Sequence, residues 1–212
     1  MSLLDEKIVS QLKDVFKGLN KDVNLKLFTQ EIECNFCKDT HNLIQEVAAT
    51  SDKIKLEVYD FQRDKEIADQ YNITKIPALV VMDEKDRGIR FFGIPSGYEF
   101  TSLISAITLV STGAHQLKKS TQDFLNYIKK PVHLQVFVTP TCPYCPPAVI
   151  MAHQMAYFSE YITADMVEAS EFTPLAVKYN IQGVPRTVVN ETEFLEGAAP
   201  EEYLIEKIKA SL

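Results

Sequence analysis

Four cysteines in two Cys-x-x-Cys motifs are the residues of this sequence best suited to chemistry. The motifs are Cys34–Asn35–Phe36–Cys37 and Cys142–Pro143–Tyr144–Cys145. Two thiols at this spacing can close a small disulfide ring at a helix start, where the helix dipole favours a thiolate. The first thiolate would attack a substrate disulfide, and the second would then release the product. The pattern predicts Cys34 and Cys142 as nucleophiles, and Cys37 and Cys145 as resolving thiols.

An Ile/Val-Pro step follows each motif at the same distance. Ile76–Pro77 and Val184–Pro185 both place proline 43 residues after the first cysteine (77 − 34 and 185 − 142). A cis proline there would turn the chain beside the cysteines and expose the backbone of Ile76 or Val184 to an extended peptide. The alternative is an ordinary trans proline at a strand start, since only about 5% of X-Pro bonds are cis. The equal spacing favours the cis interpretation.

Two acids occupy equivalent positions at predicted strand ends. Asp60 and Glu168 are 108 residues apart (168 − 60), as are the first cysteines. A carboxylate beside the resolving thiol could accept its proton during the second step. A solvated acid at a strand end is the more common case. Both residues are therefore only candidate proton acceptors.

A four-cysteine zinc site is the structural alternative for the two motifs. Zinc modules usually separate their two cysteine pairs by about 15–20 residues. Here more than a hundred residues separate Cys37 from Cys142. We therefore expect no metal and no cofactor apart from the cysteine pairs.

The elements around the motifs repeat in the same order. Tyr71–Asn72–Ile73 recurs as Tyr179–Asn180–Ile181, which repeats the offset of 108. Hydrophobic periodicity predicts helices over 3–19, 38–50, 64–71, 100–110, 121–130, 148–158, 174–179 and 200–210, and strands over 25–28, 54–59, 78–82, 89–92, 132–138, 166–169, 186–189 and 194–196. This order predicts an α/β protein of two tandem units, 1–112 and 113–212, each a mixed central sheet flanked by helices.

Composition narrows the classes of function. The chain has 212 residues, 46% of them hydrophobic and 24% charged, and a net charge of −7. A nucleic-acid binder would usually be basic. No run approaches the roughly 20 apolar residues of a membrane span, and the N-terminus has no secretory pattern. We expect a cytoplasmic protein, and cysteines in a reducing compartment are more often catalytic or metal-binding than structural.

The run Thr139–Cys145 resembles a glutaredoxin active site. Two thioredoxin-like units with one Cys-x-x-Cys each resemble the glutaredoxin-like, PDI-related protein disulfide oxidoreductases of thermophilic archaea and bacteria. The resemblance implies an enzyme that reduces, forms or isomerises protein disulfides, with disulfide-containing clients and a thioredoxin-reductase-type electron donor. By motif match it assigns the active site to Cys34, Cys37, Pro77, Cys142, Cys145 and Pro185.

The chain departs from that family pattern in two places. Thioredoxins carry a buried aspartate on the strand before the motif, where this chain has Phe28 and Val136. Pro146–Pro147 would remove two N–H donors from a helix starting at Cys142, so we expect a kink or an irregular first turn there.

Two other functions fit the same residues. One is an electron relay that delivers reducing equivalents to a dedicated peroxiredoxin-type partner. The other is a zinc-stabilised binding protein, which metal analysis would test.

Overall fold

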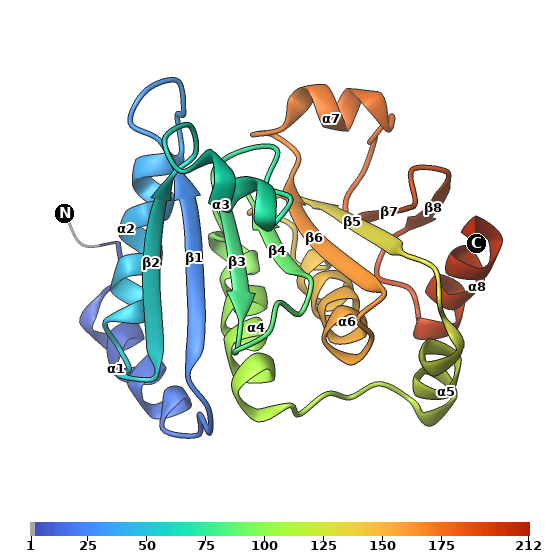
Figure 1. The fold of residues 1–212 in the computed structure, drawn as a ribbon, viewed down its shortest axis with the longest axis horizontal. Coiled ribbons are helices and arrows are strands. Elements are labelled where there is room, and N and C mark those ends of the chain that lie inside the picture. Colours follow the sequence, from blue (N-terminus) through green and yellow to red (C-terminus); the bar gives the residue numbers. More distant parts are fainter. Residues whose placement is uncertain (1–2) are drawn as a thin grey trace.

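One continuous mixed sheet forms the centre of the protein (Figure 1). The structure is a computed structural model that describes residues 3–212, so Met1 and Ser2 lie outside the described residues of the unit predicted to begin there. Over these residues the sheet has eight strands in the order β2-β1-β3-β4-β6-β5-β7-β8. The strands are β1 (Val23–Thr29), β2 (Ile54–Asp60), β3 (Ala78–Met82), β4 (Ile89–Phe92), β5 (Val132–Val138), β6 (Ile162–Glu168), β7 (Arg186–Val189) and β8 (Glu193–Glu196).

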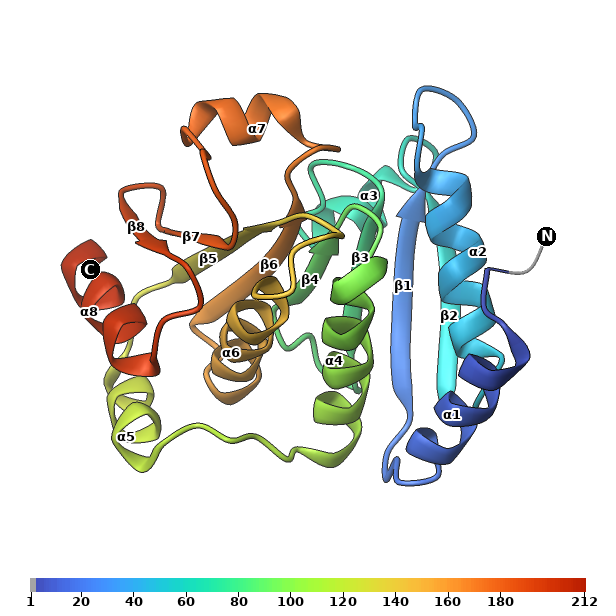
Figure 2. The ribbon, with the colours of Figure 1, turned by 180° about the vertical axis from the view of Figure 1, so that it is seen from behind.

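Helices cover both faces of this sheet (Figures 1 and 2). They are α1 (Glu6–Phe16), α2 (Cys37–Ala48), α3 (Lys65–Gln70), η1, a 3-10 turn (Gly97–Glu99), α4 (Phe100–Thr112), α5 (Lys119–Tyr127), α6 (Cys145–Phe158), α7 (Thr173–Lys178) and α8 (Glu201–Ser211). The short helices α3 and α7 lie on one face, and the longer helices lie behind the sheet in Figure 1. The protein therefore has the layered arrangement of an α/β fold.

The two halves of the sheet repeat the same pairing. In the first half, β1 runs parallel to β2 and antiparallel to β3. In the second half, β5 runs parallel to β6 and antiparallel to β7. Each half ends in an antiparallel hairpin, β3–β4 and β7–β8. The predicted fold class, two tandem α/β units with mixed sheets, is confirmed.

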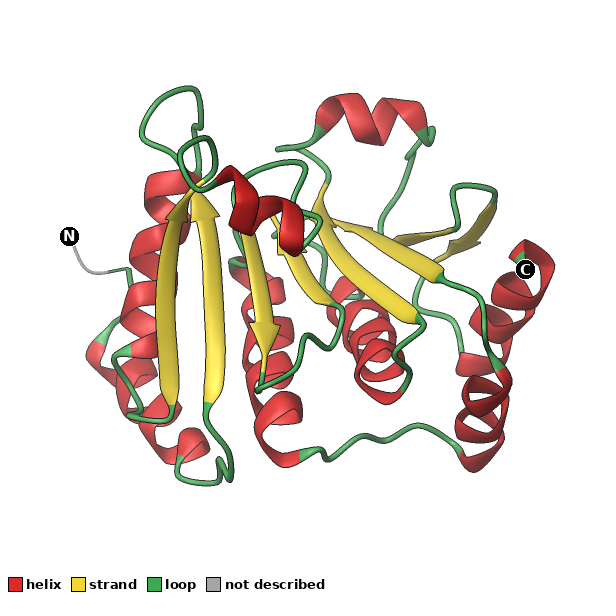
Figure 3. Ribbon diagram, viewed as in Figure 1, coloured by secondary structure: helices red, strands yellow, loops and turns green. Residues whose placement is uncertain are grey.

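The two units join through a strand pair. β4 of the first unit pairs in parallel with β6 of the second, from Ile89 opposite Ala164 to Phe92 opposite Val167. Figure 3 shows the two halves as one set of adjacent arrows. The sequence had predicted a separate sheet in each unit. Pairing satisfies the backbone groups of two strand edges that would otherwise stay open.

Apolar residues on the inward faces of strands and helices form the core. Leu43, Ile44 and Val47 of α2 are buried at the spacing of one helix face. On β1, Leu25 and Leu27 pack into the larger cluster under the long helices. The neighbouring Phe28 points to the opposite cluster, under α3 and α7. This alternation sets the strand register.

The chain passes between the units after α4. That helix ends at Thr112, and Gly113 follows with a left-handed φ of 72°. A left-handed residue, usually glycine, ends many helices. Residues 113–118 then lead to α5 (Figures 1 and 2). The predicted division between the units, 1–112 and 113–212, falls at this helix end and stays a prediction.

The helices were also compared with the dimensions of a membrane span. Within residues 3–212, none combines the length and the apolar character that crossing a membrane requires.

Candidate redox sites

Each Cys-x-x-Cys motif closes on itself as a disulfide. Cys34 bonds to Cys37 and Cys142 to Cys145, and the Cα–Cα distance is 5.5 Å in both pairs. That distance is typical of disulfides. Among residues 3–212, no group of three or more His, Cys, Asp or Glu side chains is placed to hold a metal ion. The redox groups that the structure shows are therefore the two cysteine pairs.

The helix after each motif begins at the second cysteine. α2 starts at Cys37 after its N-cap Phe36, and α6 starts at Cys145 after its N-cap Tyr144. We had expected the first cysteine to begin the helix. The first cysteine instead lies in the preceding turn, bonded to the first helical residue. Its sulfur therefore still adjoins the positive end of the helix dipole.

The expected kink at Pro146–Pro147 is absent, because α6 runs unbroken from Cys145 to Phe158. A helix starting at the second cysteine places the prolines at its second and third positions. N–H groups there have no acceptor within the helix, so proline disrupts nothing. The prolines do remove two N–H donors from the helix end beside Cys142.

Burial distinguishes the two cysteines of each pair. Cys142 is 7% exposed and Cys145 is 0% exposed. In the first motif Cys34 is half-buried, whereas Cys37 is 1% exposed. An incoming disulfide can reach only an accessible sulfur. This order is the one expected if the first cysteine attacks and the second resolves.

The two proline loops lie at equivalent places in the units. Ile76–Pro77 and Val184–Pro185 are both cis peptide bonds. The carbonyl oxygen of Val184 lies 3.7 Å from Cys142 Sγ. In the reduced protein the Cys142 thiol could donate to that oxygen. Within residues 3–212, no such contact joins Cys34 to Ile76.

Asp60 lies in a groove beside the first motif. The groove has a volume of about 290 Å³ and is lined by Gln30, Glu31, Ile32, Glu33, Asp60, Gln62 and Arg63. Asp60 Oδ1 accepts hydrogen bonds from the backbone N–H groups of Arg63 (2.9 Å) and Gln62 (3.0 Å). These bonds, that of Arg63 first, hold the pKa of Asp60 below its ordinary value. A carboxylate held in this way is a weaker base, and its role stays a prediction.

Glu168 lies at the junction of the units. It is 3% exposed, and its Oε2 accepts a 2.6 Å hydrogen bond from the Glu171 N–H. Its Oε1 has no partner among the described residues. Glu171 in turn accepts a 2.7 Å bond from Ile94 N of the first unit. Burial, with a smaller effect of the Glu168 charge, raises the pKa of Glu171 to about 7.

Glu99 of the first unit is a further buried acid, and no sequence pattern identified it as a candidate. Glu99 is 1% exposed, and both its carboxyl oxygens lack a hydrogen-bond partner within residues 3–212. Burial raises its pKa to about 7. Glu99 belongs to η1, which packs against α6, the helix that begins at Cys145. The only signal in the sequence is an acid just before the apolar helix α4.

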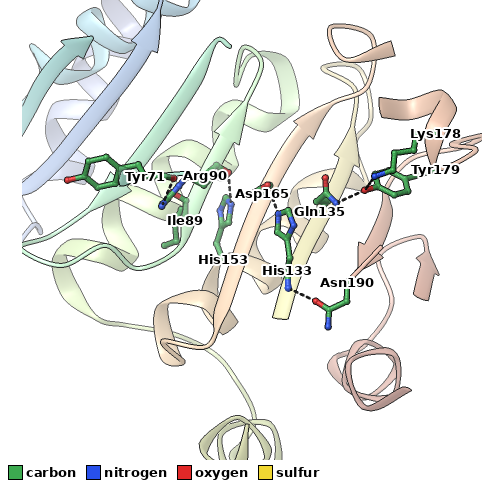
Figure 4. A network of polar contacts seen from close by, with 10 residues as sticks. All are labelled: Tyr71, Ile89, Arg90, His133, Gln135, His153, Asp165, Lys178, Tyr179 and Asn190. Carbon is green, nitrogen blue, oxygen red and sulfur yellow. Dashed lines mark hydrogen bonds and ion pairs between the residues drawn. The ribbon is translucent and has the colours of Figure 1, made fainter. Parts of the chain in front are cut away.

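Polar side chains also line the junction of the units (Figure 4). His133 Nε2 lies 2.6 Å from Asp165 Oδ2, and His153 Nε2 donates to the Arg90 carbonyl oxygen at 3.3 Å. Complete burial lowers the pKa of His153 to about 4, so this imidazole is neutral at pH 7. The network contains no cysteine. The His153–Arg90 bond joins α6 of the second unit to β4 of the first, whereas the His133–Asp165 contact lies within the second unit.

Comparison with known proteins agrees with this architecture. The model of the thioredoxin domain family matches residues 23–105 and 132–210. The crystal structure of a protein disulfide oxidoreductase from Aeropyrum pernix k1 is similar, with a TM-score of 0.91, 28% identity and coverage of 99% of this chain and 95% of that chain. The NTD_N/C domain of alkylhydroperoxide reductase AhpF from Enterococcus faecalis (V583) is also similar, with a TM-score of 0.89, 28% identity and coverage of 97% and 99%.

A longer relative matches over the same region. The NADH dehydrogenase of Bacillus subtilis (strain 168) is 27% identical over 206 residues, which are 97% of this chain and 38% of that protein. The chain thus spans less than two fifths of the length of the curated relatives it matches.

Two disulfide-forming pairs on two thioredoxin folds, with a protein disulfide oxidoreductase among the structural neighbours, support thiol–disulfide exchange as the chemistry of this chain. The matched segments cover most of the chain and hold both proline loops and both redox pairs. The chain belongs to the thioredoxin domain family.

Proposed function

We propose that this chain exchanges electrons with protein disulfides, and that Cys142–Cys145 is the pair that meets protein partners. The observation that carries the proposal is the geometry at Cys142. Its sulfur is the more accessible of the pair and lies 3.7 Å from the Val184 carbonyl oxygen. A backbone beside the attacking sulfur can guide an extended partner segment. Cys34–Cys37, with Ile76–Pro77, is the second catalytic pair.

The exchange has two steps. In the reduced protein the Cys142 thiolate attacks one sulfur of a partner disulfide, so that the partner S–S bond breaks as a new one forms to Cys142. The released partner sulfur takes up a proton. Cys145 then loses its proton and attacks Cys142, which closes the internal disulfide and frees the second partner thiol. Two electrons and two protons pass to the partner, and the reverse sequence forms a disulfide.

A buried carboxylate would accept the proton of Cys145. Glu168 is a buried acid at the end of β6, and Glu99 is a buried acid of the turn that packs on α6. A pKa of about 7 suits Glu99 to general acid–base chemistry near neutral pH. At the first site Asp60 is the candidate, although the backbone hydrogen bonds that lower its pKa make it a weaker base than Glu99.

The cysteine pairs only store electrons, so a donor outside these pairs must supply them. We propose a thioredoxin-reductase-type donor, disulfide-containing client proteins and a cytoplasmic location. The net charge of −7 favours neither nucleic acids nor anionic membrane surfaces as partners.

A dedicated relay to a peroxiredoxin-type partner is the second proposed function. It is favoured by similarity to the alkylhydroperoxide reductase domain over 97% of this chain. A relay would serve one partner, whereas a general oxidoreductase would act on unrelated disulfides.

Reduction of insulin by dithiothreitol tests the proposal. We expect the wild-type chain to accelerate insulin reduction, and a Cys142→Ser/Cys145→Ser variant to lose most of that rate. A Cys34→Ser/Cys37→Ser variant is the matched control and should retain the larger part. No acceleration of insulin reduction, together with efficient reduction of a peroxiredoxin, would replace the general function with the relay. The reverse ranking of the variants would overturn the assignment of partners to the second pair.

A further inference from the structure

A turn of the first unit reaches the redox loop of the second. The backbone N–H of Tyr98 donates a 3.0 Å hydrogen bond to the carbonyl oxygen of Pro140. Pro140 lies two residues before Cys142, whose own N–H donates to the Thr139 carbonyl oxygen at 3.1 Å. The loop that carries the nucleophile is therefore attached to η1 of the other unit.

The approach of the two backbones leaves no room for a side chain. Gly97 has a φ of +60°, and a Cβ there would lie 2.2 Å from the Pro140 carbonyl oxygen. Only glycine fits such a contact with backbone. The place of Tyr98 relative to the redox loop is consequently fixed by backbone packing.

Two tyrosines stand exposed around this contact. Tyr98 is 51% exposed, and Tyr144, between the two cysteines of the motif, is 72% exposed. Exposed tyrosines contribute strongly to protein interfaces, because the ring buries a large area at a small entropic cost. Tyr144 lies between the two cysteines, and the backbone of Tyr98 is bonded to the loop that leads to them, so both residues lie in the region that a partner disulfide approaches.

Among residues 3–212, no turn of the second unit makes a matching backbone bond to the loop before Cys34. Phe36, 42% exposed, matches Tyr144 in the first motif. However, β4 is followed by residues 93–99 before α4, whereas β8 is followed only by residues 197–200 before α8. Gly197 in that shorter connection has nothing within 4 Å of a Cβ. The longer connection of the first unit therefore allows a contact with the second redox loop, through Tyr98 and Pro140.

We propose that Tyr98 of the first unit and Tyr144 of the second form one docking surface for the protein partners of Cys142. Recognition at the second redox site then spans both units. The partner is the disulfide-bearing segment of a protein, with an apolar side chain that packs on the tyrosine rings. This inference rests on the proposed function of the Cys142–Cys145 pair.

Tyr98→Ala tests the surface by comparing two substrates. We expect kcat/KM for insulin to fall about 5–30-fold, the loss on truncating an interface side chain that contributes substantially but less than a hot spot. The value for bis(2-hydroxyethyl) disulfide, which is too small to span the surface, should fall by a much smaller factor. Tyr98→Phe keeps the ring and should restore the insulin value. Tyr127→Ala, at an 83% exposed tyrosine on α5, is the control for loss of an exposed ring.

The outcomes separate the inference from the function on which it rests. An equal loss for both substrates, or no loss for either, would overturn the docking surface while leaving the redox function in place. Failure of the wild-type chain with both disulfides would overturn the function itself.

Gly97→Ala supplies an independent variant. It should slow the second pair with both substrates, because the new Cβ displaces the Pro140 loop, and leave the alkylation rate of reduced Cys34 unchanged. Gly197→Ala introduces the same positive-φ strain without a clash and is its control. Equal effects of the two glycine variants on the second pair would contradict a role of the η1 contact.

Discussion

The two redox sites share a backbone but differ in their surroundings. Both close a disulfide across 5.5 Å, and both precede a helix that begins at the second cysteine. The first site is open and bordered by an acidic groove. The second has a nucleophile only 7% exposed and a loop held by a turn from the other unit. Repetition of a fold therefore does not produce two equal sites.

Charge and hydrogen-bond donors also differ between the sites, in opposing directions. Glu31 and Glu33 are exposed beside Cys34, and α2 has Asp39 in its first turn. These acids disfavour a thiolate at the first site. At the second site Pro146–Pro147 removes two N–H donors but introduces no charge. Lys38 partly offsets these acids, and the deeper burial of Cys142 opposes its ionisation. We expect the acids beside Cys34 to have the larger effect, so that Cys142 ionises more readily.

The largest expected effect comes from removing each resolving cysteine. Cys145→Ser should trap Cys142 in persistent mixed disulfides with proteins, and multiple turnover at this site should fall on the order of 10²-fold or more. Cys37→Ser should trap fewer protein partners, because the first site lacks the docking turn. Mass spectrometry under non-reducing conditions measures the adducts. Equal yields in the two variants would remove the functional difference between the sites.

A smaller effect concerns Glu99, the buried acid of the turn that packs against α6. The pKa of Glu99 in the folded protein is about 7, above the ordinary value of 4.5. The stability linked to this group is fully present below about pH 4.5 and is lost as the pH rises through 7. Between pH 5 and pH 8 the free energy of unfolding should fall more in the wild type than in Glu99→Gln, by on the order of 2–3 kcal/mol.

Urea unfolding of the oxidised protein at the two pH values measures this difference. Glu171 has a similarly raised pKa, so the wild-type slope should be reduced in Glu99→Gln but not abolished. Exposed Glu66→Gln is the control. Identical pH slopes for wild type and Glu99→Gln would show that this carboxyl is not buried as the structure has it.

The smallest effect is the difference in thiol pKa between the first cysteines. Cys142 should react with iodoacetamide as a thiolate at lower pH than Cys34, measured in variants that each retain one motif. Glu31→Gln/Glu33→Gln should lower the Cys34 pKa by about 0.5. A lower pKa at Cys34 than at Cys142 in the unmodified motifs would refute the argument from local charge.

Much of the fold could be predicted because its strands are apolar runs bounded by turns. The bounds of β3, β4, β5 and β7 agree with the predicted ones. β6 begins at Ile162, four residues before the predicted start at Met166. The prediction was too short because the polar residues Thr163 and Asp165 interrupt the apolar pattern. The pairing of β4 with β6 could not be predicted from local sequence patterns, because it joins strands from two different units.

Some residues of the redox sites could likewise be predicted from local patterns, whereas others could not. Cysteine spacing and the proline repeat are local patterns, so both disulfides and both proline loops could be located in the sequence. The contribution of Tyr98 and Glu99 depends on a long-range backbone contact with Pro140 and on packing against α6. No motif joins these segments, and only the assembled sheet brings them together.

The most direct test is to ask which pair a protein disulfide oxidises first. The fully reduced chain would be mixed with less than one equivalent of oxidised insulin, quenched with acid, alkylated and mapped by mass spectrometry. We predict that the Cys142–Cys145 disulfide forms before the Cys34–Cys37 disulfide. Oxidation of Cys34–Cys37 first, or of both pairs at the same rate, would contradict the account.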